Sequence, residues 1–196
     1  MKEVNGRTSE YDIDDMFLER YSPRAMSGEA LSETELLTLF EAARFAPSAR
    51  NIQPWCFVYA HVGTPEFDKL FSFLLESNQV WCKKASVLVV TLSKKTDNDG
   101  ISLSPTHSFD TGSAWMSLAL QASKMGLVAH GMGGINLDLI REKLALTDDY
   151  AVEMMIAIGK HGNIADLPEK LQAREAPSQR KPLSEIVFKG EFPLQN

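Results

Sequence analysis

Two stripes of apolar residues at helical spacing dominate the first part of the chain. The first follows Ser32, which forms an S-x-x-E capping box with Glu35, and it cannot continue through Pro47. The second begins at Thr64-Pro65, where a proline at the first helical position loses no hydrogen bond, and it fades around Ser77-Asn78. This pattern predicts two helices, one on each side of a strand-length segment.

Several apolar runs have the length of strands. Ala85 to Leu92 is almost continuous valine and leucine, which is typical of a strand covered on both faces, and Ala151 to Ile158 is the final core strand. Trp55 to Val62 predicts a third strand, and Leu127 to His130 predicts a short fourth strand before a turn at "GMGG". The polar stretch from Ser93 to His107 is expected to form a loop.

The helix expected from Asp110 to Met125 is apolar on nearly all sides, so it must be enclosed almost completely. Asn136 is expected to cap a last helix that runs to Leu146, and Gly159 opens a long tail with several prolines. A chain of 196 residues fits a single domain, residues 1–196. The combined pattern predicts an α+β sandwich with a central mixed sheet flanked by helices.

Composition narrows the function classes. The formal net charge of -6 disfavours a nucleic-acid partner or an anionic membrane surface, since both favour broad basic surfaces. No apolar run is long enough to span a bilayer, and the polar, acidic N-terminus does not resemble a signal peptide. Cys56 and Cys82 lack metal or redox spacing, and the four histidines are scattered. We expect a cytoplasmic protein with reduced core thiols and no metal.

Two small basic clusters stand out in this acidic chain. "RYSPRAM" contains Arg20, Ser22 and Arg24, and "SQRKPLSEI" contains Arg180 and Lys181. Guanidinium groups that flank a hydroxyl suit a phosphate, because arginine can bind it through two parallel hydrogen bonds. The alternative is that each cluster is simply a solvated part of the surface.

The junction "APSARNIQPWCFV" is unusually rich in hydrogen-bonding side chains. Ser48, Asn51 and Gln53 offer donors and acceptors that suit a ring with carbonyl and imide N–H groups. The alternative is a capped turn whose side chains satisfy their own backbone. Residue types and spacing alone do not favour one interpretation over the other.

Several motifs in the same order resemble the FMN-dependent nitroreductase family. They are "RYSPRAM", "EAARFAPSARNIQPWCFV", "SNQVWCKKASVLVV", "DTGSAWMSLALQASKMGL", "GMGGINLDLIREKLAL", "AIGK" and "RKPLSEIV". The resemblance covers nearly the whole chain. It implies the fold of that family, bound FMN, NADH or NADPH as the reductant, and a homodimer whose flavin sites are built by both chains.

The resemblance also implies a role for each matching residue. The phosphate and ribityl chain would be bound by Arg20, Ser22 and Arg24, with Tyr21 beside them. The flavin would be approached from the partner subunit by Pro47, Ser48 and Asn51, with Ala49 in the same binding segment and Gln53 shaping the junction. The pyrimidine edge would be contacted by Asn78, and the ring would lie against Gly131, Met132, Gly133 and Gly134. The phosphate site would be completed by Arg180 and Lys181. A backbone N–H of Gly133 or Gly134 would lie at flavin N5.

The implied activity is hydride transfer from NAD(P)H through flavin N5 to a nitroaromatic, a quinone or a similar small acceptor, by a ping-pong mechanism. No catalytic side chain is required, because solvent can supply the proton. The alternatives are a flavin-binding sensor or storage protein without efficient turnover, and an interaction domain without a cofactor. A partner subunit would also cover the apolar helix and the tail residues Phe188, Phe192 and Leu194.

Four positions depart from the family pattern or leave a role open. Trp81 replaces a polar group that often contacts the flavin edge, and Gly133 replaces an acidic residue. Arg50 adds a positive charge that would attract an anionic substrate or, as the commoner alternative, is a solvated turn residue. His107 is either a donor that faces substrate or an exposed loop residue.

Overall fold

A computed structural model describes residues 2–96, 101–102 and 105–193. The strands are β1 (Lys2–Val4), β2 (Arg7–Ser9), β3 (Trp55–His61), β4 (Val87–Lys94), β5 (Leu127–Met132) and β6 (Tyr150–Lys160). The α-helices are α1 (Asp15–Glu19), α2 (Glu33–Arg44), α3 (Pro65–Phe71), α4 (Glu76–Cys82), α5 (His107–Lys124), α6 (Leu137–Lys143) and α7 (Glu169–Gln172). Short 3-10 turns are η1 (Ala49–Asn51), η2 (Ile164–Asp166) and η3 (Leu183–Glu185).

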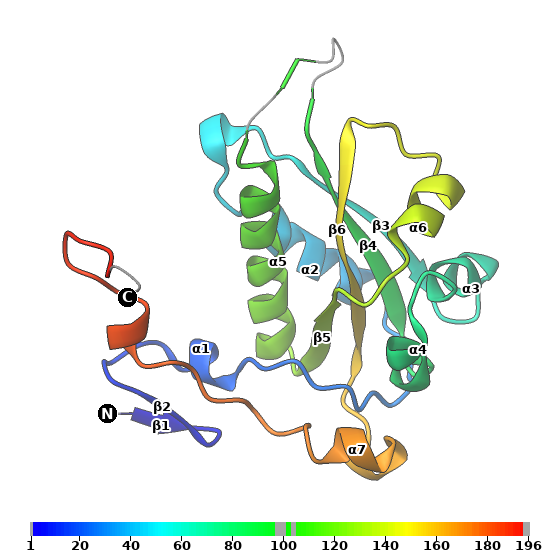
Figure 1. The fold of residues 1–196 in the computed structure, drawn as a ribbon. Helices are drawn as coiled ribbons and strands as arrows, with labels where there is room; N and C mark the ends of the chain where they lie inside the picture. The colour runs from blue at the N-terminus through cyan, green and yellow to red at the C-terminus, as the bar shows by residue number, and fades with distance from the viewer. Residues whose placement is uncertain (1, 97–100, 103–104, 194–196) are drawn as a thin grey trace.

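The core is a four-stranded sheet, in the order β3-β4-β6-β5, between two layers of helices. Alternate residues of β4 face opposite layers, as the pleat of a strand requires. Leu88, Val90 and Leu92 pack with α3, α4 and α6, whereas Val87 and Val89 pack with α2 and α5. The expected α+β sandwich of helices on a sheet is confirmed (Figure 1).

The sheet itself differs from the expectation. Each pair of neighbouring strands is antiparallel, so the described sheet is not mixed. A continuous run of valine and leucine indicates that both faces are covered, but it carries no information about strand direction. Here helices cover both faces of an antiparallel sheet, which produces the same apolar run.

Local capping signals fix the starts of three helices. Ser32 and Glu35 form the full capping box of α2, and the side chain of Thr64 accepts a hydrogen bond from Phe67 N while Pro65 occupies the first turn of α3. Asn136 caps α6 through Leu139 N. These predictions are confirmed because each depends on residues within one turn of the helix start.

Several ends differ from the sequence pattern because contacts distant in sequence decide them. The second expected helix ends at Phe71, and α4 then starts at Glu76, after Leu75 N donates to Gly134 O over 3.0 Å. Strand β4 continues into residues expected to form a loop because it pairs with β3 and β6. Strand β5 includes Gly131 and Met132, which pair with β6 instead of forming a turn. Helix α5 begins earlier than expected, and α6 ends sooner.

Helix α5 is not enclosed on nearly all sides within one chain. It buries Ala114, Leu118 and Ala122 against the sheet. Phe109 and Met116, however, are 77% and 38% exposed. Among the residues that the structure describes, no helix is long and apolar enough to cross a membrane.

The chain termini pack against each other along one end of the fold. The β1–β2 hairpin lies beside the C-terminal tail, which runs back past α7 (Figure 1). Gln179 Nε2 donates to Gly6 O over 2.6 Å, and Leu183 N donates to Glu10 Oε1 over 3.1 Å. Phe188 and Phe192 of this tail are exposed, and Leu194 lies outside the described residues.

Candidate functional site

A cavity of about 490 Å³ opens where the two terminal segments meet strand β5. A volume of this size is typical of small-molecule and cofactor sites. Five of the lining residues are arginines, and within the described part of the chain no carboxylate lines the cavity. The lining residues are Arg7, Arg20, Tyr21, Ser22, Arg24, His130, Gly131, Arg174, Ala176, Ser178 and Arg180.

Arg20 is a half-buried cation of this cavity. Its Nε is buried and has no hydrogen-bond partner among the residues that the structure describes, and its Nη1 donates to Ser22 Oγ over 3.4 Å. Burial, followed by repulsion from Arg180, lowers the pKa of Arg20. A guanidinium placed in this way is costly unless an anion pairs with it, because burial penalises an uncompensated charge. The cavity is therefore electrostatically suited to a phosphate.

Arg7 was not anticipated from the sequence, and its role is to hold the terminal segments together. Its Nη1 donates to Leu18 O over 3.1 Å and to Arg20 O over 2.5 Å, while its Nε donates to Ser178 O over 2.9 Å. The residue is only 4% exposed, and burial lowers its pKa. Its partners lie up to 171 positions away, so no local pattern indicates the contact.

Glu175 holds the backbone of the N-terminal segment that carries Arg20 and Arg24. Its Oε1 accepts hydrogen bonds from Arg24 N over 2.6 Å and from Ala25 N over 2.7 Å. Its Oε2 lies 3.9 Å from Arg24 Nη1, which is an ion-pair distance without a hydrogen bond. Burial and the nearby Glu175 charge raise the pKa of Tyr21, which keeps its hydroxyl protonated. Glu175 was also missed by sequence reasoning.

The tail brings one of its two expected cations to the cavity. Arg180 lines the cavity, and its Nη1 donates to Ser178 Oγ over 3.0 Å. Lys181 does not line it and lies 3.9 Å from Glu185 on the surface. Arg174 takes the second position from the tail. Lys181 thus lies outside the lining that its neighbour Arg180 joins, and its part in a phosphate site stays a prediction.

Asn78 does not line the cavity but forms a hydrogen-bonded group with Gly134 and Trp81. Its Nδ2 donates to Gly134 O over 3.0 Å, and its Oδ1 accepts from Trp81 Nε1 over 3.3 Å. A Cβ on Gly134 would lie 2.7 Å from Asn78 Nδ2, so this approach requires glycine. Trp81 is 4% exposed, and its ring lies 4.7 Å from that of His130, which lines the cavity. The tryptophan that departs from the family pattern therefore orients Asn78.

Strand β5 contributes a histidine and a bare glycine to the lining. His130 Nδ1 donates to Pro23 O over 3.0 Å, and burial lowers the pKa of this histidine. A Cβ on Gly131 would lie 3.1 Å from Met154 Sδ and 3.2 Å from Trp115 Cζ2. The side chain of Met132, in contrast, is buried in the core beside Cys82. Met132 and Gly133 do not line the cavity, and Gly133 has open space on the side where a side chain would stand.

The segment from Pro47 to Gln53 lies at the other end of the fold, near the start of α5 (Figure 1). It does not line the cavity. Ser48 Oγ accepts from Gln53 N over 3.0 Å, and Gln53 Nε2 donates to Asn51 O over 3.2 Å, as the capped-turn interpretation requires. Arg50, Asn51 and Gln53 nevertheless have φ values of 51°, 57° and 56°. Three non-glycine residues in this region of φ indicate a turn held under strain.

Metal chemistry has no candidate site in the described ranges, where no group of three or more His, Cys, Asp or Glu side chains is placed to hold an ion.

No curated protein matches the sequence. A model of the nitroreductase family matches residues 18–80, which include the "RYSPRAM" segment, the 47–53 segment and Asn78.

Comparison with solved structures extends this match to the whole chain. A crystal structure described as an oxidoreductase containing FMN is 46% identical, with a TM-score of 0.95 and 100% of both chains covered. The chain belongs to the nitroreductase family. It is therefore an oxidoreductase.

More distant structures share the fold of this nitroreductase-family protein. A nitroreductase family protein from Clostridium difficile 630 is 24% identical, with a TM-score of 0.70 and coverage of 93% of this chain and 100% of the other. A nitroreductase family protein from Streptococcus pneumoniae TIGR4 is 20% identical, with a TM-score of 0.69 and coverage of 89% and 98%.

Proposed function

We propose that this nitroreductase-family protein binds FMN with its phosphate in the arginine-lined cavity and reduces a nitroaromatic, a quinone or a similar small acceptor at the expense of NAD(P)H. The observation that carries the proposal is Arg20, a half-buried guanidinium whose buried Nε has no partner within the described part of the chain. A phosphate supplies the missing acceptor and the missing charge. The similar oxidoreductase at 46% identity is described as containing FMN, which supports the choice of anion.

The residues at the site fit FMN as a whole. Arg20 and Arg180 would hold the phosphate, Ser22 would donate to it, and Glu175 would keep the N-terminal segment in place through its backbone contacts. Gly131, in β5, lines the cavity without a side chain, and Gly133 has open space on the side where a side chain would stand, which suits the close approach of a flat ring. Asn78, held by Trp81, would present its amide at the edge of that ring.

When bound, FMN supplies the hydride chemistry that joins NAD(P)H oxidation to acceptor reduction, in two half-reactions at one site. The chain's part is to bind and orient the reactants at about 3–3.5 Å. Its arginines would also stabilise negative charge that develops during reduction.

We further propose that the active form is a homodimer and that Pro47, Ser48, Ala49, Asn51 and Gln53 reach the flavin of the partner subunit. Within one chain this segment lies away from the cavity, so only a second copy would bring the two together. Exposed apolar side chains on α5 and the tail, including Phe109, Phe188 and Phe192, favour such an interface.

The visible spectrum of the purified protein tests the cofactor and the reductant together. We expect a flavin spectrum, release of FMN but not FAD on denaturation, and bleaching by NADH or NADPH that a quinone or a nitroaromatic reverses. Parallel steady-state plots at several acceptor concentrations are expected for two half-reactions at one site. A colourless protein would refute FMN binding, and bleaching too slow for turnover would favour a sensor or storage protein.

Mixing two damaged chains tests the shared site. In a heterodimer of an Arg20→Ala chain and an Asn51→Ala chain, one site has both residues intact and the other lacks both. FMN content and activity should therefore rise above those of either damaged homodimer. An FMN-loaded, active monomer in sedimentation would contradict the shared site.

A further inference from the structure

A chain of hydrogen bonds at the start of α5 joins a histidine to a carboxylate through a buried serine. Ser93 Oγ donates to Glu153 Oε1, and it lies 2.8 Å from His107 Nδ1. A serine hydroxyl carries one proton, so Ser93 must accept the hydrogen bond from His107 Nδ1–H. Ser108 Oγ also donates to Glu153 Oε1, over 2.7 Å. The cluster thus places the imidazole proton on Nδ1 and leaves Nε2 with a free lone pair.

The position of Glu153 depends on an irregularity in the sheet. The register between β4 and β6 shifts here, so that Thr91 pairs with Met154 while Leu92 pairs with Val152. Glu153 is the extra residue of this bulge. Bulges change the direction of a side chain, and this one brings a carboxylate to the face of the sheet that carries Ser93.

The cluster is adjacent to the 47–53 segment. Ser93 pairs with Trp55 in the sheet, and Lys94 N donates to Pro54 O over 2.8 Å. One turn beyond His107, Asp110 Oδ2 accepts from Ala49 N over 3.1 Å. The same turn of α5 therefore positions both His107 and the strained segment proposed to face the flavin of the partner subunit.

Ser93 is fully buried, so it cannot act as a nucleophile toward a substrate. The side chain of His107, in contrast, is 20% exposed, and among the described residues none forms a hydrogen bond with its Nε2. An imidazole that is fixed at one nitrogen and open at the other is the usual arrangement of a general acid or base.

We propose that His107, oriented by Ser93 and Glu153, gives a proton from Nε2 to the oxygen of a quinone acceptor during its reduction. This inference rests on the proposed function and adds a proton donor to it. His107 would be a catalytic residue, and Ser93 and Glu153 would be positioning residues.

The step balances as follows for a quinone. The acceptor receives a hydride, which brings two electrons and one hydrogen, and one proton from Nε2–H of the imidazolium bonds to the quinone oxygen. The product is a hydroquinone, and His107 becomes neutral imidazole protonated on Nδ1, hydrogen-bonded to Ser93. A solvent proton then restores the imidazolium.

Rapid kinetics of the FMN-loaded protein separate this inference from the proposed function. In His107→Gln, bleaching by NAD(P)H should be unchanged, and reoxidation by benzoquinone should slow by about 100-fold. Reoxidation by ferricyanide, which accepts electrons without a proton, should be unaffected. His61→Gln is the matched control, because His61 also contacts a glutamate, Glu33, but one that stands at the start of α2.

The outcomes identify which idea fails. Absence of bleaching in the unchanged protein overturns the proposed function and with it the proton donor. Normal bleaching with equal benzoquinone rates in His107→Gln and the unchanged protein overturns the proton donor alone. In a His107→Gly chain, added imidazole should restore part of the benzoquinone rate, which a purely structural role of His107 would not allow.

A measurement that does not depend on turnover tests the hydrogen-bond chain itself. Nitrogen-15 shifts of the neutral imidazole should show the proton of His107 on Nδ1, and in Ser93→Ala or Glu153→Gln this preference should be lost. A proton found on Nε2 in the unchanged neutral imidazole would contradict the arrangement.

Discussion

The two polar regions of this protein satisfy their hydrogen bonds in opposite ways. At the arginine-lined cavity, the residues that the structure describes provide neither a hydrogen-bond partner for the buried Arg20 Nε nor a carboxylate in the lining. At the start of α5, the polar side chains pair with one another, as Ser93 does with Glu153. The first region lacks an acceptor for Arg20 Nε, whereas in the second Ser93, Glu153 and His107 Nδ1 pair with one another.

This difference indicates that the cavity is suited to bind a ligand, whereas the cluster at the start of α5 is suited to orient side chains. A site with uncompensated positive charge gains free energy when an anion enters it. A cluster that is already satisfied gains little from a ligand, but it holds its side chains in one geometry. We therefore expect substitutions at the cavity to change affinity and those at α5 to change rates.

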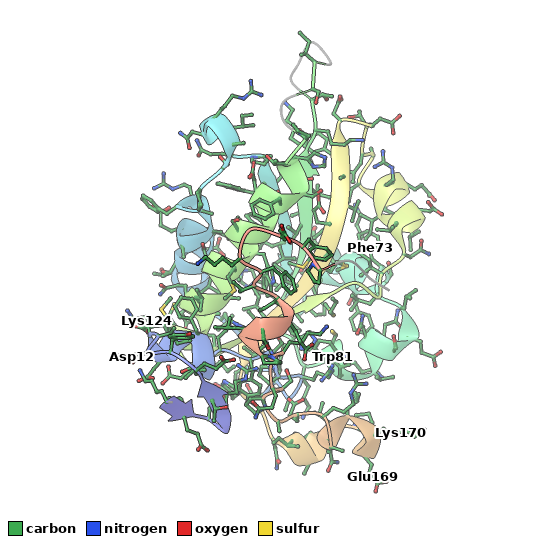
Figure 2. The ribbon with its side chains drawn as sticks, turned by 60° about the vertical axis from the view of Figure 1, so that its left-hand side comes forward. Asp12, Phe73, Trp81, Lys124, Glu169 and Lys170 are labelled. Atoms are coloured by element: carbon green, nitrogen blue, oxygen red, sulfur yellow. The ribbon has the colours of Figure 1, made fainter. Side chains whose placement is uncertain are left out.

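The largest effect is expected for Glu175→Ala, which removes the carboxylate that keeps the cavity's N-terminal segment in place. Two backbone N–H groups lose their acceptor, so the free energy of unfolding should fall by about 3 kcal/mol. Urea denaturation measures this change. Glu169→Ala is the control, since its side chain projects outward from α7 (Figure 2). Equal stabilities of the two variants would contradict the bracing role of Glu175.

Arg20→Ala tests the charge imbalance directly. FMN affinity should fall by about 1.5–3 kcal/mol, because a charge-assisted contact to the phosphate is lost. Fluorescence titration with FMN measures the change. The cofactor-free protein should not be destabilised, since burial and Arg180 already disfavour the charge on Arg20. Arg44→Ala, on the exposed face of α2, is the control. Unchanged FMN affinity in Arg20→Ala would refute the phosphate site.

Gly133 and Gly134, two neighbouring glycines that follow β5, give a matched comparison. Gly134→Ala would force Asn78 away and break its hydrogen bonds to Gly134 O and Trp81, at a cost of about 1–2 kcal/mol in unfolding free energy. Gly133→Ala meets no atom within 4 Å and should have little effect. Thermal or urea denaturation distinguishes them, and a larger loss in Gly133→Ala would contradict the assigned packing.

The smallest effect concerns pH and His130. Burial lowers the pKa of His130 in the folded protein, so the unfolded chain binds this proton more tightly. The free energy of unfolding should therefore be highest above about pH 6.5 and should fall as the pH drops below that value. Urea denaturation of the cofactor-free protein measures the slope, which should be smaller in His130→Gln. The same slope in both proteins would show that another group is responsible.

Local signals in the chain were sufficient for much of the fold. The capping box of Ser32 and Glu35, the Thr64-Pro65 start and the Asn136 cap each involve residues within one helical turn, and all three are confirmed. The motifs also led to the family, because "RYSPRAM" and the 47–53 junction keep their residue types and spacing.

The cavity was only partly predictable. Arg20, Tyr21, Ser22, Arg24, Gly131 and Arg180 were expected at a ligand site and do line the cavity, while their contacts with a flavin stay predictions. Arg7 and Glu175 could not be foreseen, because their partners are contributed by the opposite end of the chain. His130 follows a strand pattern, and nothing in its neighbours indicates that it faces a cavity.

Residue order alone thus set the helix starts, the apolar strands and the motifs, since these depend on neighbours a few positions apart. The antiparallel direction of the sheet, the bulge at Glu153 and the meeting of the two termini emerged only when the chain was folded. Each depends on hydrogen bonds between backbone groups or side chains far apart in sequence. Because such contacts are decided by which segments can pack and pair together, no local pattern records them.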